Sequence, residues 1–238
     1  MFRRELHRAM AQVLDAFDEE VLERTSFRFA GGTRIALEHG EFRVSRDLDF
    51  ICSDAEGYAD LRALVRERGY DALLHGSKRA TFGLPREIRA DQYGLRFPVV
   101  VAGATIRVEL IREARIVLGA AEHASWTRVP LLSIPDLFAE KLLANSDRGL
   151  DHDGLARDLV DLAVLRRAHG PVPDAVWVAV ERAYRAGPRK DLRTVAEHFL
   201  ADPAYQQRCL GGLGVEGDPE LVVEGVGALL ADLDVPLA

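Results

Sequence analysis

The sequence predicts an α+β fold, with a mixed β-sheet and flanking helices in residues 1–130 and an all-helical C-terminal half in residues 131–238. Two observations support this prediction. Short runs in which apolar and polar residues alternate, as they do in strands, occur before residue 130. After Pro130 the apolar residues recur at helical spacing, and Gly and Pro separate the segments. We therefore expect two domains that meet near residue 130.

The first half should alternate helices and strands. Apolar residues at helical spacing predict an amphipathic helix over residues 2–24. Further helices are expected at 33–39, where Thr33 can cap the first turn, and at 56–68, which ends at Gly69. Residues 102–104, Ala-Gly-Ala, are typical of a hairpin turn. The expected strands are 26–30, 48–51, 81–84, 93–101 and 105–111.

The second half should contain only helices. Gly149 and several Gly-Pro or Gly-Gly pairs separate them. Neither internal repeats nor low-complexity tracts occur in the sequence. The predicted helices are 135–144, 155–168, 175–185, 192–200 and 219–233.

The composition is that of an ordinary globular protein, with 48% hydrophobic and 29% charged residues. Two cysteines, Cys52 and Cys209, are too few for a disulfide framework or a structural zinc site. No apolar run approaches the ~18 residues that span a bilayer. The N-terminus also lacks the apolar core of a secretory signal. We therefore expect a cytoplasmic protein without a membrane partner.

The charge distribution is uneven. A formal net charge of −7 argues against constitutive, non-specific DNA binding, because such domains are usually positive. Between Arg62 and Arg115, however, basic residues outnumber acidic ones. Arginine is the dominant basic residue, and the lysines are Lys78, Lys141 and Lys190. A lysine in such a chain is of interest because its compact charge is not equivalent to that of arginine.

The segment at Gly31-Gly32-Thr33 combines a strand end, a glycine pair, a hydroxyl residue and a helix start. Glycine lets the backbone approach an anion closely. The following helix N-terminus offers unpaired N–H groups and the positive end of the helix dipole. The segment is therefore a candidate phosphate-binding turn. The alternative is a plain strand-to-helix turn, because glycine is common at turns.

Asp47 and Asp49 stand two residues apart at the start of an apolar strand. Alternate residues of a strand point to the same face, so the two carboxylates should converge while Leu48 and Phe50 face the core. A bound cation is the simplest way to keep both ionised. Carboxylate oxygens without nearby His or Cys suit Mg²⁺ or Mn²⁺. The alternative is a solvated strand end.

Glu109 lies on the polar face of the strand expected at 105–111. If this strand pairs with the strand at 48–51, Glu109 completes a triad with Asp47 and Asp49. Three carboxylates can hold two divalent ions, which align a triphosphate with an attacking hydroxyl. The alternative for Glu109 is an ion pair with a neighbouring arginine. Strand order decides between the two, and the sequence does not reveal it.

These segments together resemble a known family. Gly-Gly-Thr at 31–33, a short helix, and Arg-x-Ser-x-Asp-Leu-Asp-Phe at 43–50 resemble the nucleotidyltransferase fold of the DNA polymerase β superfamily, and more closely its AbiEii/AbiGii toxin group. In the helical half, residues 135–144 resemble the lysine helix of the group, and residues 155–162 resemble its Arg-Asp-x-x-Asp-Leu segment. The resemblance implies a nucleotidyltransferase-type sheet in residues 1–130 and a helical domain, residues 131–238, that completes the active site.

The resemblance assigns two groups of residues in the first half. The phosphates of an NTP substrate would be held by Gly31, Gly32, Thr33 and Arg46. The catalytic carboxylates, which would also bind Mg²⁺ or Mn²⁺, are Asp47, Asp49 and Glu109. The chain departs from the family pattern at Arg34, where a small or apolar residue is usual.

In the second half the resemblance singles out one lysine and its acidic neighbours. Lys141 would contact the phosphates or the base of the nucleotide, a contact that suits a compact ammonium. Asp158 would orient Lys141 or a substrate hydroxyl, and Asp161 is the alternative for that role. The alternative for Lys141 is a solvated helix lysine, and for Asp158 an exposed capping or i,i+4 contact, with Arg157 as its partner.

The implied function is Mg²⁺-dependent transfer of a nucleoside monophosphate from an NTP to an acceptor hydroxyl. The acceptor implied by the resemblance is the 3′ end of a tRNA, and the role is that of a toxin in a type IV-like system with a cognate antitoxin protein. One alternative is the same core acting on a small molecule or a protein. Another is a non-catalytic module that binds a nucleotide or a partner; the intact carboxylates argue against it, because like charges held together without use are unfavourable.

Overall fold

The computed structural model describes residues 2–235 and divides the chain into two compact units. The sheet unit comprises Met1–Leu37 and Arg46–Ser133, and the helical unit comprises Glu38–Ser45 and Ile134–Ala238. The division after Ser133 lies close to the boundary expected at residue 130. The segment Glu38–Ser45 differs from that expectation, because it belongs to the helical unit.

This segment belongs with the helices because its backbone and a buried side chain are bonded there. The N–H of Val44 donates to the carbonyl of Leu213 at 3.0 Å. The guanidinium of Arg43 pairs with the carboxylate of Asp161 at 2.7 and 2.8 Å. Both contacts join residues more than a hundred positions apart in the chain, so a local sequence pattern does not indicate them.

The strands are β1 (Arg28–Ala30), β2 (Asp47–Cys52), β3 (Arg89–Ala90), β4 (Gly94–Val101) and β5 (Ala104–Arg112). Within residues 2–235 they form one five-stranded sheet in the order β1-β2-β5-β4-β3. β2 and β5 run parallel and the other neighbours run antiparallel, so the predicted mixed sheet is confirmed. The predicted hairpin turn is also confirmed, since Ala102 and Gly103 both have positive φ, 49° and 78°, as a two-residue hairpin turn requires.

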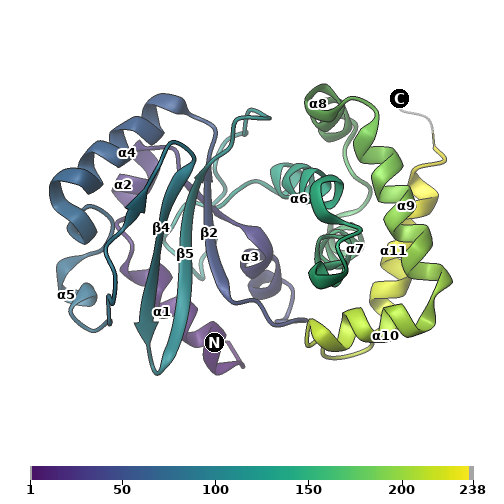
Figure 1. Ribbon diagram of the computed structural model, residues 1–238, viewed down its shortest axis with the longest axis horizontal. Coiled ribbons are helices and arrows are strands. Elements are labelled where there is room, and N and C mark those ends of the chain that lie inside the picture. Colours follow the sequence, from purple (N-terminus) through teal and green to yellow (C-terminus); the bar gives the residue numbers. More distant parts are fainter. Residues whose placement is uncertain (1, 236–238) are drawn as a thin grey trace. The chain divides into compact units, whose positions relative to one another are not determined.

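One face of this sheet is covered by helices. The helices of the sheet unit are α1 (Glu5–Ala16), α2 (Glu19–Arg24), α3 (Gly31–Glu38), α4 (Ala55–Arg68) and the single turn α5 (Gly76–Arg79), with a 3₁₀ turn at Gly69–Ala72. α1 packs on β4 and β5, and α4, which lies to the left of the strands in Figure 1, packs on β2. Leu48, Phe50, Val108 and Leu110 are fully buried in this core. The alternate residues of β2 and β5 therefore lie on the opposite face.

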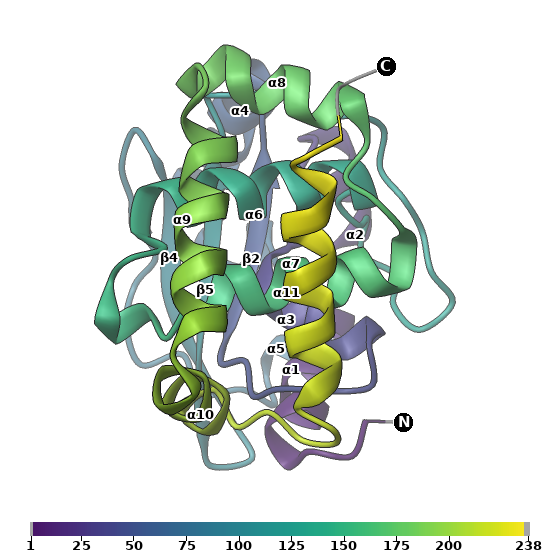
Figure 2. The same ribbon diagram turned by 90° about the vertical axis from the view of Figure 1, so that its right-hand side faces the viewer.

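The helical unit consists of α6 (Ile134–Arg148), a 3₁₀ turn (His152–Gly154), α7 (Arg157–His169), α8 (Asp174–Tyr184), α9 (Gly187–Ala201), α10 (Pro203–Gly212) and α11 (Glu220–Asp232). Figure 2 shows α9 and α11 side by side, crossing over α6 and α7. Leu142, Leu159, Phe199 and Val226 are buried between these helices. Among residues 2–235, no helix combines the length and the apolar character needed to cross a membrane.

Several details differ from the predicted elements, among them the unexpected β3 and α5. The helix expected over 2–24 is broken at Phe17, which is extended, and Asp18 caps the new helix by accepting from the N–H of Val21. The strand expected at 81–84 is reduced to an isolated bridge between Gly83 and Val100. α10 was not expected, because the glycines at its end were interpreted as a break. Its start signal was Asp202 followed by a proline, a sequence typical of a helix N-terminus.

Leu48→Ala tests the core of the sheet unit. Leu48 is fully buried on β2, so removing its methyl groups leaves a cavity that should lower the free energy of unfolding by about 2–5 kcal/mol. Urea denaturation followed by circular dichroism measures the loss. Val117→Ala is the surface control, because Val117 is 91% exposed. An equal loss in both variants would contradict the assignment of Leu48 to the core.

Candidate functional site

Asp47, Asp49 and Glu109 lie next to one another on one face of the sheet, and we call them the carboxylate row. Asp47 and Asp49 are the first and third residues of β2, so both point away from the face that buries Leu48. The parallel pairing of β2 with β5 sets Asp49 opposite Glu109 and Asp47 opposite Arg107. The strand order, which the sequence did not reveal, thus brings all three carboxylates to neighbouring positions.

Arg107 bridges the carboxylate row. Its Nε and Nη2 donate to Oδ1 and Oδ2 of Asp47 at 3.1 and 2.8 Å, and its Nε lies 3.5 Å from Oε1 of Glu109. The hydrogen bonds to Asp47 and the charges of the row raise the pKa of Arg107, although partial burial opposes the rise. The side chain is 62% exposed, so water screens the pair. An ion pair between Glu109 and a neighbouring arginine, the alternative weighed above, is therefore present in the structure.

The chemistry of the row suits a hard divalent cation, since its donors are carboxylate oxygens. As the side chains stand, no three His, Cys, Asp or Glu residues in the described part of the chain are grouped so that they could hold a metal ion. The guanidinium of Arg107 lies against Asp47 and Glu109 instead. The residue types and the strand register thus fit Mg²⁺ or Mn²⁺, whereas the side chains as they stand are paired with Arg107.

Gly31 forms the closest approach between the candidate phosphate-binding turn and the row. Its φ is +73°, and a Cβ at this position would lie 2.3 Å from Oδ2 of Asp49. Glycine is therefore the residue that fits. The hydroxyl of Thr33 donates to the backbone carbonyl of Asp47 at 2.5 Å. α3 begins at Gly31, two residues earlier than predicted, so Thr33 lies within its first turn instead of capping it.

The other residues singled out in the turn region differ in exposure. Gly32 is buried in the first turn of α3, whereas Arg46 is exposed directly before β2. Arg34, the departure from the family pattern, is 1% exposed. Its Nη2 pairs with Oε2 of Glu122 at 3.0 Å, so its charge is compensated inside the sheet unit.

In the helical unit Lys141 lies between two buried aspartates. Its Nζ is 2.9 Å from Oδ1 of Asp158 and 2.7 Å from Oδ2 of Asp161. Arg43 completes the pairing of Asp161, and Arg148 contacts Asp158 at 2.8 Å. Lys141 is 7% exposed and the two aspartates are 3% and 0% exposed, so the interpretations of Lys141 as a solvated lysine and of Asp158 as an exposed helix residue are wrong. We call these five residues the buried ion cluster.

The pKa values in the buried ion cluster reflect its pairing. Burial by itself raises the pKa of Asp158, but the charge of Lys141 and the hydrogen bonds from Arg148 outweigh it and hold that pKa below its usual value. In the same way burial is outweighed at Asp161 by Arg43 and Lys141, and its pKa is lowered. Burial would lower the pKa of Lys141, yet the two carboxylates raise it. All three groups are therefore ionised at neutral pH.

The structure gathers the predicted residues into two groups, one in each unit. Gly31, Thr33 and the carboxylate row belong to the sheet unit, and Lys141 with its aspartates belongs to the helical unit. Sequence reasoning gave no partner to Arg43 or Arg148, which contact the buried aspartates, whereas it left open an ion pair between Glu109 and a neighbouring arginine. Arg107 offered a signal, because it shares the polar face of its strand with Glu109. Neither Arg43 nor Arg148 did, since an arginine reveals its buried partner only in the folded chain.

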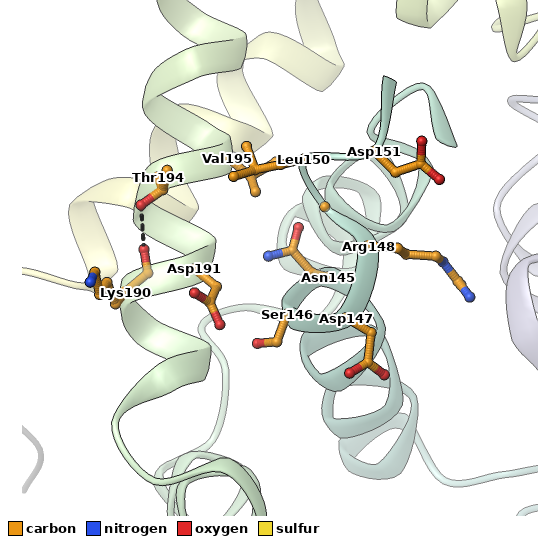
Figure 3. Close-up of a pocket in the computed structure, with 11 residues that line it drawn as sticks. Asn145, Ser146, Asp147, Arg148, Leu150, Asp151, Lys190, Asp191, Thr194 and Val195 are labelled. Carbon is orange, nitrogen blue, oxygen red and sulfur yellow. Dashed lines mark hydrogen bonds between the residues drawn. The ribbon is translucent and has the colours of Figure 1, made fainter. Parts of the chain in front are cut away.

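A separate pocket of about 410 Å³ lies in the helical unit. Its walls come from the end of α6, the loop that follows, and α9, and Figure 3 shows the side chain of Asn145 between the two helices. Asn145 is 1% exposed, and within residues 2–235 its amide atoms have no hydrogen-bond partner. Lys141 and Asp158 do not line this pocket. We assign it no part in the chemistry of the carboxylate row.

One family model matches more than half of this chain. A family model described as the nucleotidyl transferase AbiEii toxin of a type IV toxin–antitoxin system matches residues 12–210. Among solved structures, JHP933 from Helicobacter pylori is similar over 98% of this chain and 93% of that chain, with 18% identity and a TM-score of 0.53. MenT4, a nucleotidyltransferase toxin from Mycobacterium tuberculosis H37Rv, is similar over 97% and 84%, with 18% identity and a TM-score of 0.50. At such identities these structures show a shared fold. No curated protein matches the chain.

Lys141→Met tests the buried ion cluster. The change leaves Asp158 and Asp161 buried beside one cation fewer, so it should lower the free energy of unfolding by about 3–5 kcal/mol. Lys190→Met is the matched control, because Lys190 is exposed on α9. This change should alter the free energy of unfolding by no more than about 0.5 kcal/mol. Denaturation in urea measures both. Equal stability of the two variants would show that Lys141 does not stabilise the helical unit.

The pH dependence of this loss separates charge from packing. The lowered pKa values of Asp158 and Asp161 contribute stability above the ordinary aspartate pKa of about 4, and the contribution is lost as the pH falls towards the folded-state values. In Lys141→Met these pKa values rise, so protonation removes less stability from the variant than from the wild type. The difference in unfolding free energy should therefore narrow between about pH 7 and about pH 3. A difference that is constant with pH would assign the loss to packing alone.

Proposed function

We propose that this chain, which belongs to the AbiEii family of nucleotidyltransferase toxins, transfers a nucleoside monophosphate from an NTP to an acceptor. The proposed acceptor is the 3′ end of a tRNA. The proposed reaction depends on Mg²⁺ or Mn²⁺. The observation that carries the proposal is the pairing of β2 with β5, which sets Glu109 beside Asp49. The Gly31 turn meets the same aspartate. A carboxylate row beside a glycine turn is the arrangement that a metal-bound triphosphate needs.

The proposed roles in the sheet unit follow from donor type. Asp47, Asp49 and Glu109 act as the metal ligands. A divalent ion bound there would lower the pKa of the acceptor hydroxyl and neutralise charge on the leaving group. The triphosphate is held by the N–H groups at the start of α3 and by a nearby cation, and the residues proposed for this are Gly31, Gly32, Thr33 and Arg46.

In the helical unit we propose that Lys141 acts on the nucleotide and that Asp158 orients it. The 2.9 Å contact between Nζ of Lys141 and Oδ1 of Asp158 supports the second part. Asp161, which was the alternative for the orienting role, contacts the same Nζ at 2.7 Å. The contacts therefore support orientation of Lys141 by both aspartates.

The proposed reaction breaks a phosphoanhydride bond of the NTP and forms a phosphodiester bond to the acceptor. The oxygen of the acceptor hydroxyl forms a bond to the α-phosphorus of the NTP. The bond between the α-phosphorus and the oxygen that bridges to the β-phosphate breaks, and pyrophosphate leaves with that electron pair. The hydroxyl proton passes to solvent. The arrangement requires positioning and charge compensation from the protein, and it uses no covalent enzyme intermediate.

We infer the macromolecular partners from the family and from charge. A type IV toxin–antitoxin family implies an antitoxin protein as partner. The excess of arginine between Arg62 and Arg115 supports an RNA acceptor, because phosphate contacts need local positive charge even on an acidic protein. We further propose that the protein acts in the cytoplasm, where both NTP and tRNA are present.

Asp49→Asn tests the proposed function. The variant loses a charged ligand of the row, so it should fail to label RNA from NTPs that carry a radioactive α-phosphate. Its unfolding temperature should not fall, because the change removes one of three neighbouring like charges. The assay offers total RNA, each NTP in turn, and Mg²⁺ or Mn²⁺.

Asp60→Asn is the matched control, since Asp60 is an exposed aspartate on α4 of the same unit. It should label RNA as the wild type does. Labelling by Asp49→Asn at the wild-type rate would reject the row as the metal site. Wild-type labelling of a small molecule or a protein in place of tRNA would reject the proposed acceptor and leave the transfer chemistry standing.

A further inference from the structure

Arg107 occupies the part of the carboxylate row that a cation would use. Both carboxylate oxygens of Asp47 accept a hydrogen bond from this guanidinium, at 3.1 and 2.8 Å. The same Nε is 3.5 Å from Glu109. Two N–H groups on two oxygens form the planar, paired geometry in which arginine binds carboxylates most strongly. The nearest positive charge to the row is thus supplied by the chain itself.

Arg107 and a metal ion compete for the carboxylate of Asp47. A divalent cation needs lone pairs of the oxygens that Arg107 now engages, and two positive groups on one carboxylate repel each other. Without any cation, the three carboxylates of the row repel as well. Arg107 therefore reduces the repulsion between the carboxylates in the metal-free protein. The same contact weakens the binding of a metal ion.

We propose that Arg107 is the resident counter-ion of the carboxylate row, that it holds Asp47 and Glu109 when no metal is bound, and that it competes with a divalent cation for Asp47. The inference rests on the proposed function, since it assumes that the row is the metal site. Arg107 then sets the metal affinity of the protein, although it is not itself a ligand. Its 62% exposure leaves the side chain room to move into solvent.

Arg96 provides a matched comparison on the neighbouring strand. It stands opposite Glu109 on β4 and carries the same charge. Its Nε is 4.0 Å from Oε1 of Glu109, and its Nη1 pairs with Asp91 at 3.1 Å. Within residues 2–235 it makes no contact with Asp47. Loss of Arg96 therefore removes a nearby positive charge without freeing the aspartate.

The test is a titration of the full chain with Mn²⁺ alone, followed by electron paramagnetic resonance of the free ion. Arg107→Gln should tighten the Mn²⁺ dissociation constant by roughly three- to tenfold, the range expected when one exposed, paired contact no longer competes. Arg107→Lys should tighten it by a smaller factor, because lysine keeps the charge but cannot hold both oxygens of Asp47. At about 0.5 M salt, where distant charges are screened, Arg96→Gln should bind Mn²⁺ with the dissociation constant of the wild type.

Thermal unfolding supplies a second measurement that does not depend on activity. In EDTA, Arg107→Gln should unfold at a lower temperature than the wild type, because the row has lost its counter-ion. Saturating Mn²⁺ should raise the unfolding temperature of the variant more than that of the wild type, since binding no longer breaks an ion pair.

The outcomes separate this inference from the proposed function. Equal Mn²⁺ affinity in the wild type and both Arg107 variants would overturn the role of Arg107 and leave the metal site standing. Equal tightening by Arg107→Gln and Arg96→Gln at high salt would also overturn it, because the effect would then be one of general charge. If neither the wild type nor any variant binds Mn²⁺, both the metal site and the role of Arg107 fall.

Discussion

Repulsion between neighbouring carboxylates is the constraint on which the candidate site depends. The parallel register of β2 and β5 holds Asp47, Asp49 and Glu109 at adjacent positions whether or not a cation is near. Their backbone positions are fixed, because Leu48 and Val108 anchor the same strands in the core. Close approach of Gly31 adds the backbone of α3 to one side of the row. Each polar contact around the row can be understood as a response to this charge.

The helical unit meets the same problem under different conditions. Asp158 and Asp161 are buried, so their charges are compensated by three cations with close to complete pairing. The carboxylate row is partly exposed, and Arg107 meets it with one paired contact and one longer one, while Arg96 lies 4.0 Å from Glu109. Water screens an exposed charge and does not reach a buried one. The ion pairs of the buried ion cluster are therefore costly to break, whereas the ion pair between Arg107 and the row can be replaced by another cation.

Membership of the AbiEii family extends over the two units, since the matched residues 12–210 include both the row and the buried ion cluster. The departure at Arg34 is accommodated locally: the guanidinium is buried and its charge meets Glu122, a residue of the same unit. A buried arginine is tolerated when a carboxylate pairs with it, because an uncompensated charge in the core is far more costly.

The sequence by itself determined the helical half, the strand that carries Asp47 and Asp49, the hairpin before Glu109 and the residue types of the site, because each depends on spacing along a short stretch of chain. It also supported the family, since the two motifs together are specific. Only the tertiary structure decided that β5 lies beside β2, that Arg107 contacts Asp47, and that residues 38–45 join the helical unit. It also showed that Lys141 is buried between two aspartates. These contacts join residues that are distant in sequence, and their partners are chosen by packing and charge in the folded chain, which no local pattern encodes.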